Sequence, residues 1–78
     1  MPQTRFIITT ARDTANSAYA ALEAAFEDDG YPLAIVEIDE EADIHEVSLY
    51  TDDDPDDVEP RLRAALSSAG IELEPVRE

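Results

Sequence analysis

Residues 34–50, with the sequence AIVEIDEEADIHEVSLY, decide the fold of this chain. Residues 34–39 and 44–50 each alternate apolar and polar side chains, which is the pattern of strands that bury one face. The four residues between them, EEAD, are too few for a crossover helix. We therefore expect two antiparallel strands that are neighbours in a sheet and are joined as a hairpin.

One strand and one helix are predicted before this hairpin. Residues 5–10, RFIITT, are rich in β-branched side chains and indicate a strand. From residue 13 onward, apolar side chains recur at helical spacing, with Asp13 as the expected N-cap. Gly30 suits the left-handed position just past that helix, and Pro32 blocks its continuation.

A second helix and a last strand are predicted after the hairpin. Residues 58–69 place apolar side chains on one helical stripe. We expect this helix to begin near Asp57, because Pro60 is tolerated only in a first turn. Gly70 closes the helix, and residues 71–76, IELEPV, alternate as a strand, in which Pro75 indicates a sheet edge or the strand's end.

The resulting order is strand, helix, strand, strand, helix, strand. Two right-handed β-α-β units joined by a hairpin form a four-stranded antiparallel sheet with both helices on one face. We therefore expect an α+β, ferredoxin-like fold, with the other face of the sheet free. Because a chain of 78 residues has room for only one core, residues 1–78 are expected to form one domain.

The composition is strongly acidic. Twenty acidic residues oppose five arginines, which gives a formal net charge of −15, and there is no lysine or cysteine. Such a surface repels nucleic acid and anionic membranes and attracts basic proteins, although acidity can also serve only solubility. The lack of cysteine suits the cytoplasm, and no segment resembles a signal peptide or membrane span. A cytoplasmic monomer is expected.

Residues that could carry chemistry are few. His45 is the only histidine of the sequence, and its place within a predicted strand favours a packing role over a catalytic one. The acids at 52, 54 and 56 have calcium-loop spacing, but Asp57 replaces the turn glycine and Arg63 replaces the final acid. Gly30 and Gly70 do not form a phosphate-binding loop. No catalytic, cofactor-binding or metal-binding residue is therefore predicted.

Two acidic clusters are the candidates for binding a protein. Residues 27–29, EDD, are expected at the carboxyl end of the first helix, where the helix dipole disfavours negative charge. Either their presence reflects composition alone, or a basic partner contacts this corner together with the hairpin tip. The candidate protein-binding residues are Glu27, Asp28, Asp29, Asp39, Glu40, Glu41 and Asp43.

Four stretches of the sequence point to a known family. They are residues 5–10 (RFIITT), 25–34 (AFEDDGYPLA), 37–40 (EIDE) and 44–50 (IHEVSLY). Together they resemble the amino-terminal domain of the bacterial methyltransferase that modifies ribosomal protein L11, especially its alphaproteobacterial branch. The likeness covers residues 4–69. His45 departs from the family pattern, which has a tryptophan at this point.

The resemblance implies a ferredoxin-like substrate-recognition domain tethered to a Rossmann-like catalytic domain that binds S-adenosylmethionine. That catalytic domain is not in this chain, so the chain is expected to be a fragment of a longer enzyme and to hold no cofactor itself. The implied partner is a small basic ribosomal protein, whose charge complements this acidic domain.

Two other classes of function share the fold. A free-standing regulatory module that binds a small ligand is the main alternative. An acyl-phosphate hydrolase is a third reading, but the chain lacks the anion-binding loop with an arginine that this chemistry needs.

Overall fold

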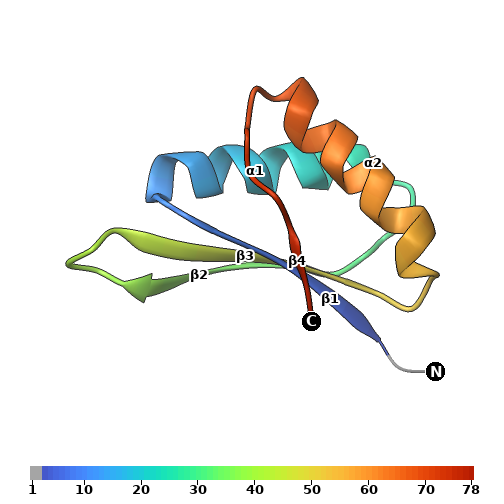
Figure 1. Cartoon of the computed structure of the whole chain (residues 1–78), viewed down its shortest axis with the longest axis horizontal. Helices are drawn as coiled ribbons and strands as arrows, with labels where there is room; N and C mark the ends of the chain where they lie inside the picture. Colours follow the sequence, from blue (N-terminus) through green and yellow to red (C-terminus); the bar gives the residue numbers. More distant parts are fainter. Residues whose placement is uncertain (1–2) are drawn as a thin grey trace.

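The computed structural model describes residues 3–78, which form one sheet and two helices (Figure 1). The elements in chain order are β1 (Thr4–Thr10), α1 (Arg12–Ala25), β2 (Leu33–Asp39), β3 (Ile44–Thr51), α2 (Pro55–Ser68) and β4 (Val76–Arg77). The strands are ordered β2-β3-β1-β4, all neighbours are antiparallel, and both helices cover the same face. The predicted α+β, ferredoxin-like fold is confirmed.

The hairpin that decides the fold is present as expected. Ile35 lies opposite Val47, so the two apolar side chains share the face beneath the helices. The register shifts between Glu37 and Asp39, and Asp43 adopts a positive φ of 53° in the turn. The irregularity therefore lies at the tip, and the paired part of the hairpin stays regular.

The core fills the space between the sheet and the helices. Phe6 and Ile8 of β1 lie opposite Leu49 and Val47 of β3, so the four side chains form one apolar patch on the sheet. The apolar stripes of α1 and α2 close over this patch. The buried apolar side chains are Phe6, Ile8, Ala15, Ala18, Leu22, Phe26, Val47, Leu49, Val58, Leu62, Leu66 and Ile71. Neither helix, at 14 residues each, is long and apolar enough to cross a bilayer.

The start of α1 differs from the sequence prediction. The N-cap is Ala11, which has extended backbone angles and makes no side-chain cap bond. Asp13 is not the cap but lies in the first turn. Because only Ala11 separates β1 from α1, the short connection fixes where the helix begins. The carboxylate of Asp13 still lies beside the positive end of the helix dipole, where it is favourable.

The start of α2 also differs, since the helix begins at Pro55 instead of near Asp57. The side chain of Asp54 accepts a hydrogen bond from the backbone N–H of Asp56 at 2.9 Å, and Pro55 occupies the first helical position. Pro60 consequently lies inside the helix and leaves one backbone carbonyl without its partner. A capped start with proline at the first position outweighs that single missing bond.

The end of α2 is a Schellman motif, which fixes the path of the last segment. Gly70 has a φ of 75°, its N–H donates to the Ser67 carbonyl at 3.0 Å, and the N–H of Ile71 donates to the Leu66 carbonyl at 2.9 Å. Ile71 and Leu66 are both buried, as this motif favours. The left-handed conformation predicted for Gly30 is confirmed, and so is the prediction that Gly70 closes the second helix.

The predicted strand over residues 71–76 is wrong for most of its length. Only Val76–Arg77 pairs with β1, opposite Ile7 and Phe6. Residues 71–75 descend from the helix layer to the sheet, so they reach β1 only at their end (Figure 1). Ile71 and Pro75 are buried on the way. The segment alternates because it packs against the core, and β4 lies at the sheet edge as Pro75 indicated.

Candidate functional site

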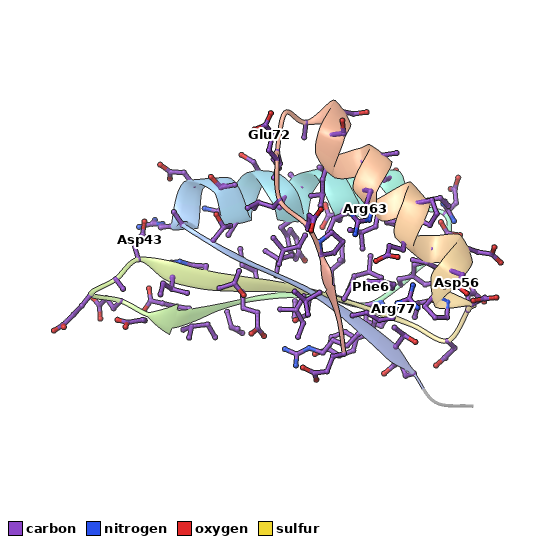
Figure 2. The ribbon with its side chains drawn as sticks, in the orientation of Figure 1. Phe6, Asp43, Asp56, Arg63, Glu72 and Arg77 are labelled. Carbon is purple, nitrogen blue, oxygen red and sulfur yellow. The ribbon has the colours of Figure 1, made fainter. Side chains whose placement is uncertain are left out.

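The structure does not bring the two predicted acidic clusters together. Asp43 marks the hairpin tip at one end of the molecule, whereas Asp56 marks the start of α2 at the other end (Figure 2). Residues 27–29 follow α1 and lie at the α2 end, because Asp29 contacts Arg61 of α2. The expected single corner is therefore two separate surfaces. That these residues bind a protein stays a prediction.

The first of these surfaces is larger than the sequence prediction, because the loop between β3 and α2 adds acids to residues 27–29. We call this surface the acidic end. It consists of Glu27, Asp28, Asp29, Asp52, Asp53, Asp54, Asp56 and Asp57. The direction of the elements could have predicted that these acids lie together. Both α1 and β3 run antiparallel to β1, so their carboxyl ends lie at the same end of the sheet.

Asp29 is tied to α2 by an ion pair. Both of its carboxylate oxygens accept hydrogen bonds from Arg61, at 2.7 and 3.3 Å, and the guanidinium lies 4.7 Å from the ring centre of Phe26. The hydrogen bond from Arg61 lowers the pKa of Asp29 below its ordinary value, and the same bond raises the pKa of Arg61. Asp29 therefore joins the turn after α1 to α2, whereas within residues 3–78 no ion pair involves Glu27 or Asp28.

This ion pair predicts a pH-dependent contribution to stability. Because the pKa of Asp29 is lowered in the folded chain, the contribution is present above about pH 4 and is lost as the pH falls through the folded pKa. Arg61→Gln should therefore reduce the free energy of unfolding more at neutral pH than near pH 3. Urea denaturation at both pH values measures this difference.

The appropriate control is Asp28→Asn, which removes a neighbouring carboxylate that makes no ion pair within the described part of the chain. It should leave stability unchanged or raise it, because the chain carries a net charge of −15. The contact between Arg61 and the ring of Phe26 does not depend on a titrating acid. A loss in Arg61→Gln that is equal at both pH values would assign the whole effect to that stacking contact.

A shallow hollow opens beside Asp29 at the acidic end. It has a volume of about 330 Å³, and its walls include Asp29, Tyr31, Tyr50 and Asp53. The hydroxyl of Tyr31 donates a hydrogen bond to the carboxylate of Asp53, which raises the pKa of Tyr31. The backbone N–H of Asp53 donates to the hydroxyl of Thr51 at 3.0 Å. The loop is thus held in place by the segment that precedes β2 and by the last residue of β3.

The hairpin tip is the second acidic surface. Asp39 accepts a hydrogen bond from the backbone N–H of Ala42 at 3.1 Å, which holds the turn, and Glu40 and Glu41 are exposed. His45 follows the turn with its ring nitrogens 3.7 Å from carboxylate oxygens of Asp43 and Glu37. Neither distance is that of a hydrogen bond, and within residues 3–78 the buried Nδ1 of His45 has no hydrogen-bond partner.

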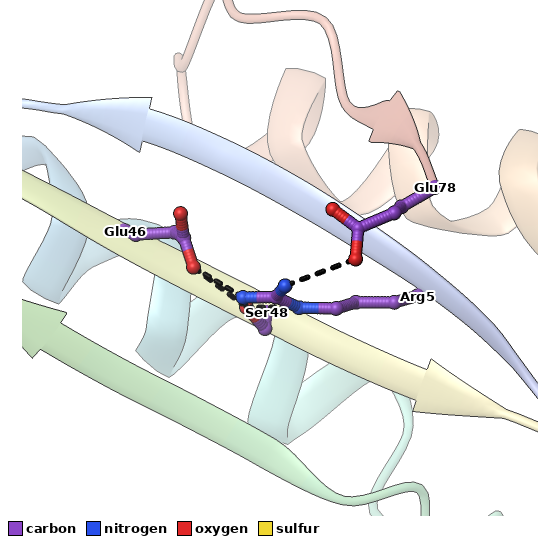
Figure 3. Close-up of polar contacts among 4 residues, drawn as sticks. All are labelled: Arg5, Glu46, Ser48 and Glu78. Carbon is purple, nitrogen blue, oxygen red and sulfur yellow. Dashed lines mark hydrogen bonds and ion pairs between the residues drawn. The ribbon is translucent and has the colours of Figure 1, made fainter.

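The sheet face away from the helices carries an ion-pair network that the sequence did not reveal (Figure 3). Arg5 donates to the hydroxyl of Ser48 at 3.0 and 3.2 Å, donates to Glu78 at 3.2 Å and contacts Glu46. Burial alone would lower the pKa of Arg5, but the hydrogen bond to Glu78 and the nearby negative groups raise it. The guanidinium is therefore fully engaged within the domain.

The described residues define the class of this domain. It is an acidic ferredoxin-like domain with acidic surfaces at both ends, and residues 3–78 contain no cluster of three or more metal-ligating side chains. The calcium-like spacing at residues 52–56 serves the helix start, because Asp54 caps α2.

Comparison with known proteins identifies the relatives of this domain. The chain is 49% identical over 78 residues to the ribosomal protein L11 methyltransferase of Mesorhizobium japonicum, covering all of this chain and 27% of that protein. It is 53% identical over 72 residues to the protein of the same name from Chelativorans, covering 91% of this chain and 25% of that protein. The Brucella suis methyltransferase is 42% identical over 74 residues, 95% of this chain and 26% of that protein.

These matches confirm the resemblance to the amino-terminal domain of the ribosomal protein L11 methyltransferases. The chain spans about a quarter of the length of the relatives it matches. No protein-family model matches the chain, and no solved structure matches it significantly.

Proposed function

We propose that this chain is the substrate-recognition domain of a protein methyltransferase that modifies ribosomal protein L11. The observation that carries the proposal is a sequence match. All or nearly all of the chain matches a segment that makes up about a quarter of the length of proteins named ribosomal protein L11 methyltransferase. A domain of this size suits recognition, with the transfer reaction carried out by another part of the enzyme.

S-adenosylmethionine is the methyl donor that this activity implies, and residues 3–78 do not fit it. A nucleoside cofactor of this kind is commonly held by a glycine-rich turn between a strand and the following helix. Here β1 is joined to α1 by Ala11 alone, and the loop from β3 to α2 is an aspartate run without glycine. We therefore assign the cofactor to the proposed catalytic domain.

Charge supports a basic protein as the partner. The net charge of −15 attracts a cationic protein and repels nucleic acid, membranes and other copies of the chain. Among the described residues, four of the eight carboxylates at the acidic end take part in ion pairs or hydrogen bonds, which leaves Glu27, Asp28, Asp52 and Asp57 to act on a partner. Attraction of this kind speeds and orients encounter more than it tightens the final complex.

The proposal predicts direct binding of purified ribosomal protein L11 to this chain. Isothermal titration calorimetry at low salt should show a one-to-one complex with a dissociation constant in the micromolar range, because a single domain contributes only part of the enzyme's contacts. An acidic protein of equal size should show no binding. Absence of binding to L11 at about 100 μM of each protein would overturn the proposal.

The main alternative function, a small-ligand regulatory module, has no observation in its favour. The hollows among residues 3–78 are shallow, whereas a small-ligand site encloses most of its ligand.

A further inference from the structure

The outer edge of β2 carries backbone groups that no other strand of residues 3–78 uses. The N–H of Tyr50 donates to the Pro32 carbonyl at 3.0 Å, which marks their pair as hydrogen-bonded. Hydrogen-bonded pairs alternate along an antiparallel ladder, so Ala34 and Val36 also bond to β3. The intervening residues, Leu33, Ile35 and Glu37, direct their N–H and C=O groups away from β3.

This edge is long and apolar enough to accept another strand. β2 is an outer strand of the sheet, and its residue Val36 is 48% exposed. The other outer strand, β4, has only two residues. The register between β2 and β3 shifts between Glu37 and Asp39, which ends the regular alternation of backbone groups, so the regular stretch of the outer edge is residues 33–37.

A hollow lies beside the first residue of this stretch. It has a volume of about 270 Å³ and is lined by side chains of α1 and of the turn after it, including Tyr19, Glu23, Glu27 and Tyr31, together with Leu33 of β2. It lies on the side of α1 away from α2, because a different groove with Ala21, Ala25 and Ala69 in its walls runs between the two helices. Aromatic walls with two carboxylates suit the apolar stem and the cation of a lysine or arginine.

Charge decides which strand this edge can accept. A second copy would bring another chain with a net charge of −15 against Glu37 and the two glutamates of the hollow. An extended basic segment meets the same groups with opposite charge. Strand addition gives affinity through backbone hydrogen bonds and specificity through alternate side chains. The exposed edge, the hollow and the charge therefore select the same occupant.

We propose that the outer edge of β2 binds an extended basic segment of a protein partner as an added strand, with a lysine or arginine side chain in the hollow beside Leu33. The proposal rests on the proposed function, which it deepens by naming the surface and the form of the substrate that is recognised.

Amide hydrogen exchange of the isotope-labelled chain tests this arrangement directly. The first probe is a capped peptide of alternating lysine and valine, and the second is purified ribosomal protein L11. Either probe at saturation should slow exchange at the N–H groups of Leu33, Ile35 and Glu37 by about tenfold or more. The N–H groups of Ala34 and Val36 should change little, because they already donate to β3. A peptide of alternating aspartate and valine should have no effect.

Two substitutions with matched controls separate the edge from the hollow. Glu37→Pro removes an outward N–H and should weaken peptide binding about tenfold, whereas Glu37→Gln removes only the charge and should weaken it about twofold. Glu23→Lys places a positive charge at the hollow and should weaken binding about tenfold, but Glu41→Lys at the hairpin tip should have a much smaller effect. Unchanged exchange at Ala34 and Val36 shows that each variant retains its sheet.

The outcomes distinguish this proposal from the proposed function. Binding of L11 without slower exchange at Leu33, Ile35 and Glu37 would overturn the edge proposal and leave the recognition function standing. Protection by the lysine peptide without any binding of L11 would support the edge and overturn the proposed function. Protection of the same amides that grows with chain concentration, with no probe present, would show that a second copy is the occupant and would overturn the choice of a basic strand.

Discussion

Leu62→Ala is expected to lower the free energy of unfolding by about 2–5 kcal/mol. Leu62 is 0% exposed and lies in α2 within the core that both helices form with the sheet. Removing its terminal carbons loses apolar burial and leaves a cavity that the close-packed surroundings fill only in part. Because small domains are marginally stable, this loss is a large share of the total.

Urea denaturation followed by circular dichroism measures this effect, and Val76→Ala is the control. Val76 is 63% exposed in β4, so its truncation should change the free energy of unfolding by less than about 0.5 kcal/mol. If the two substitutions had similar effects, Leu62 would not be part of a close-packed core. The placement of α2 over the sheet would then be wrong.

Association of the chain with ribosomal protein L11 is expected to slow by about tenfold or more when sodium chloride rises from about 0.1 M to about 1 M. The screening length falls from about 10 Å to about 3 Å over this range. The chain's charge of −15 then no longer attracts the basic protein before contact. Dissociation should change much less, because close contacts in the complex are screened less. Stopped-flow or surface-based kinetics separates the two rates.

Paired substitutions identify which carboxylates make the association rate depend on salt. Replacing Glu27 and Asp28 at the acidic end by Gln and Asn should make the association rate less dependent on salt. Replacing Glu72 and Glu74 by Gln removes the same charge from the segment that follows α2, and it should change the salt dependence less. An association rate that is indifferent to salt would refute the electrostatic part of the proposed function. It would leave recognition to contacts such as those of the β2 edge.

The helix boundaries show where sequence patterns stop being decisive. Apolar periodicity correctly predicted that α1 and α2 exist, because burial of one face requires it. It did not fix their first residues. The one-residue connection at Ala11 started α1 before Asp13 could cap it, and the Asp54 cap with Pro55 started α2 despite Pro60. Local capping and connection length decide these boundaries.

The last segment shows a different limit. Ile71 and Leu73 alternate with glutamates as in a strand, yet residues 71–75 form no ladder with β1. The same period arises when an extended segment packs its apolar side chains on a core without pairing. Only the path from the end of α2 down to the sheet, fixed by the turn at Gly70, distinguishes the two cases.

The sequence by itself determined the order of elements, the antiparallel hairpin, the ferredoxin-like fold and the acidic character, because short-range periodicity, turn residues and composition carry that information. Only the tertiary structure decided which acids lie together. It separated residues 27–29 from the hairpin tip, joined them to the aspartates after β3, and left the outer edge of β2 open beside a hollow. The physical reason is that proximity between distant residues depends on strand direction and sheet order, which packing of the whole chain fixes.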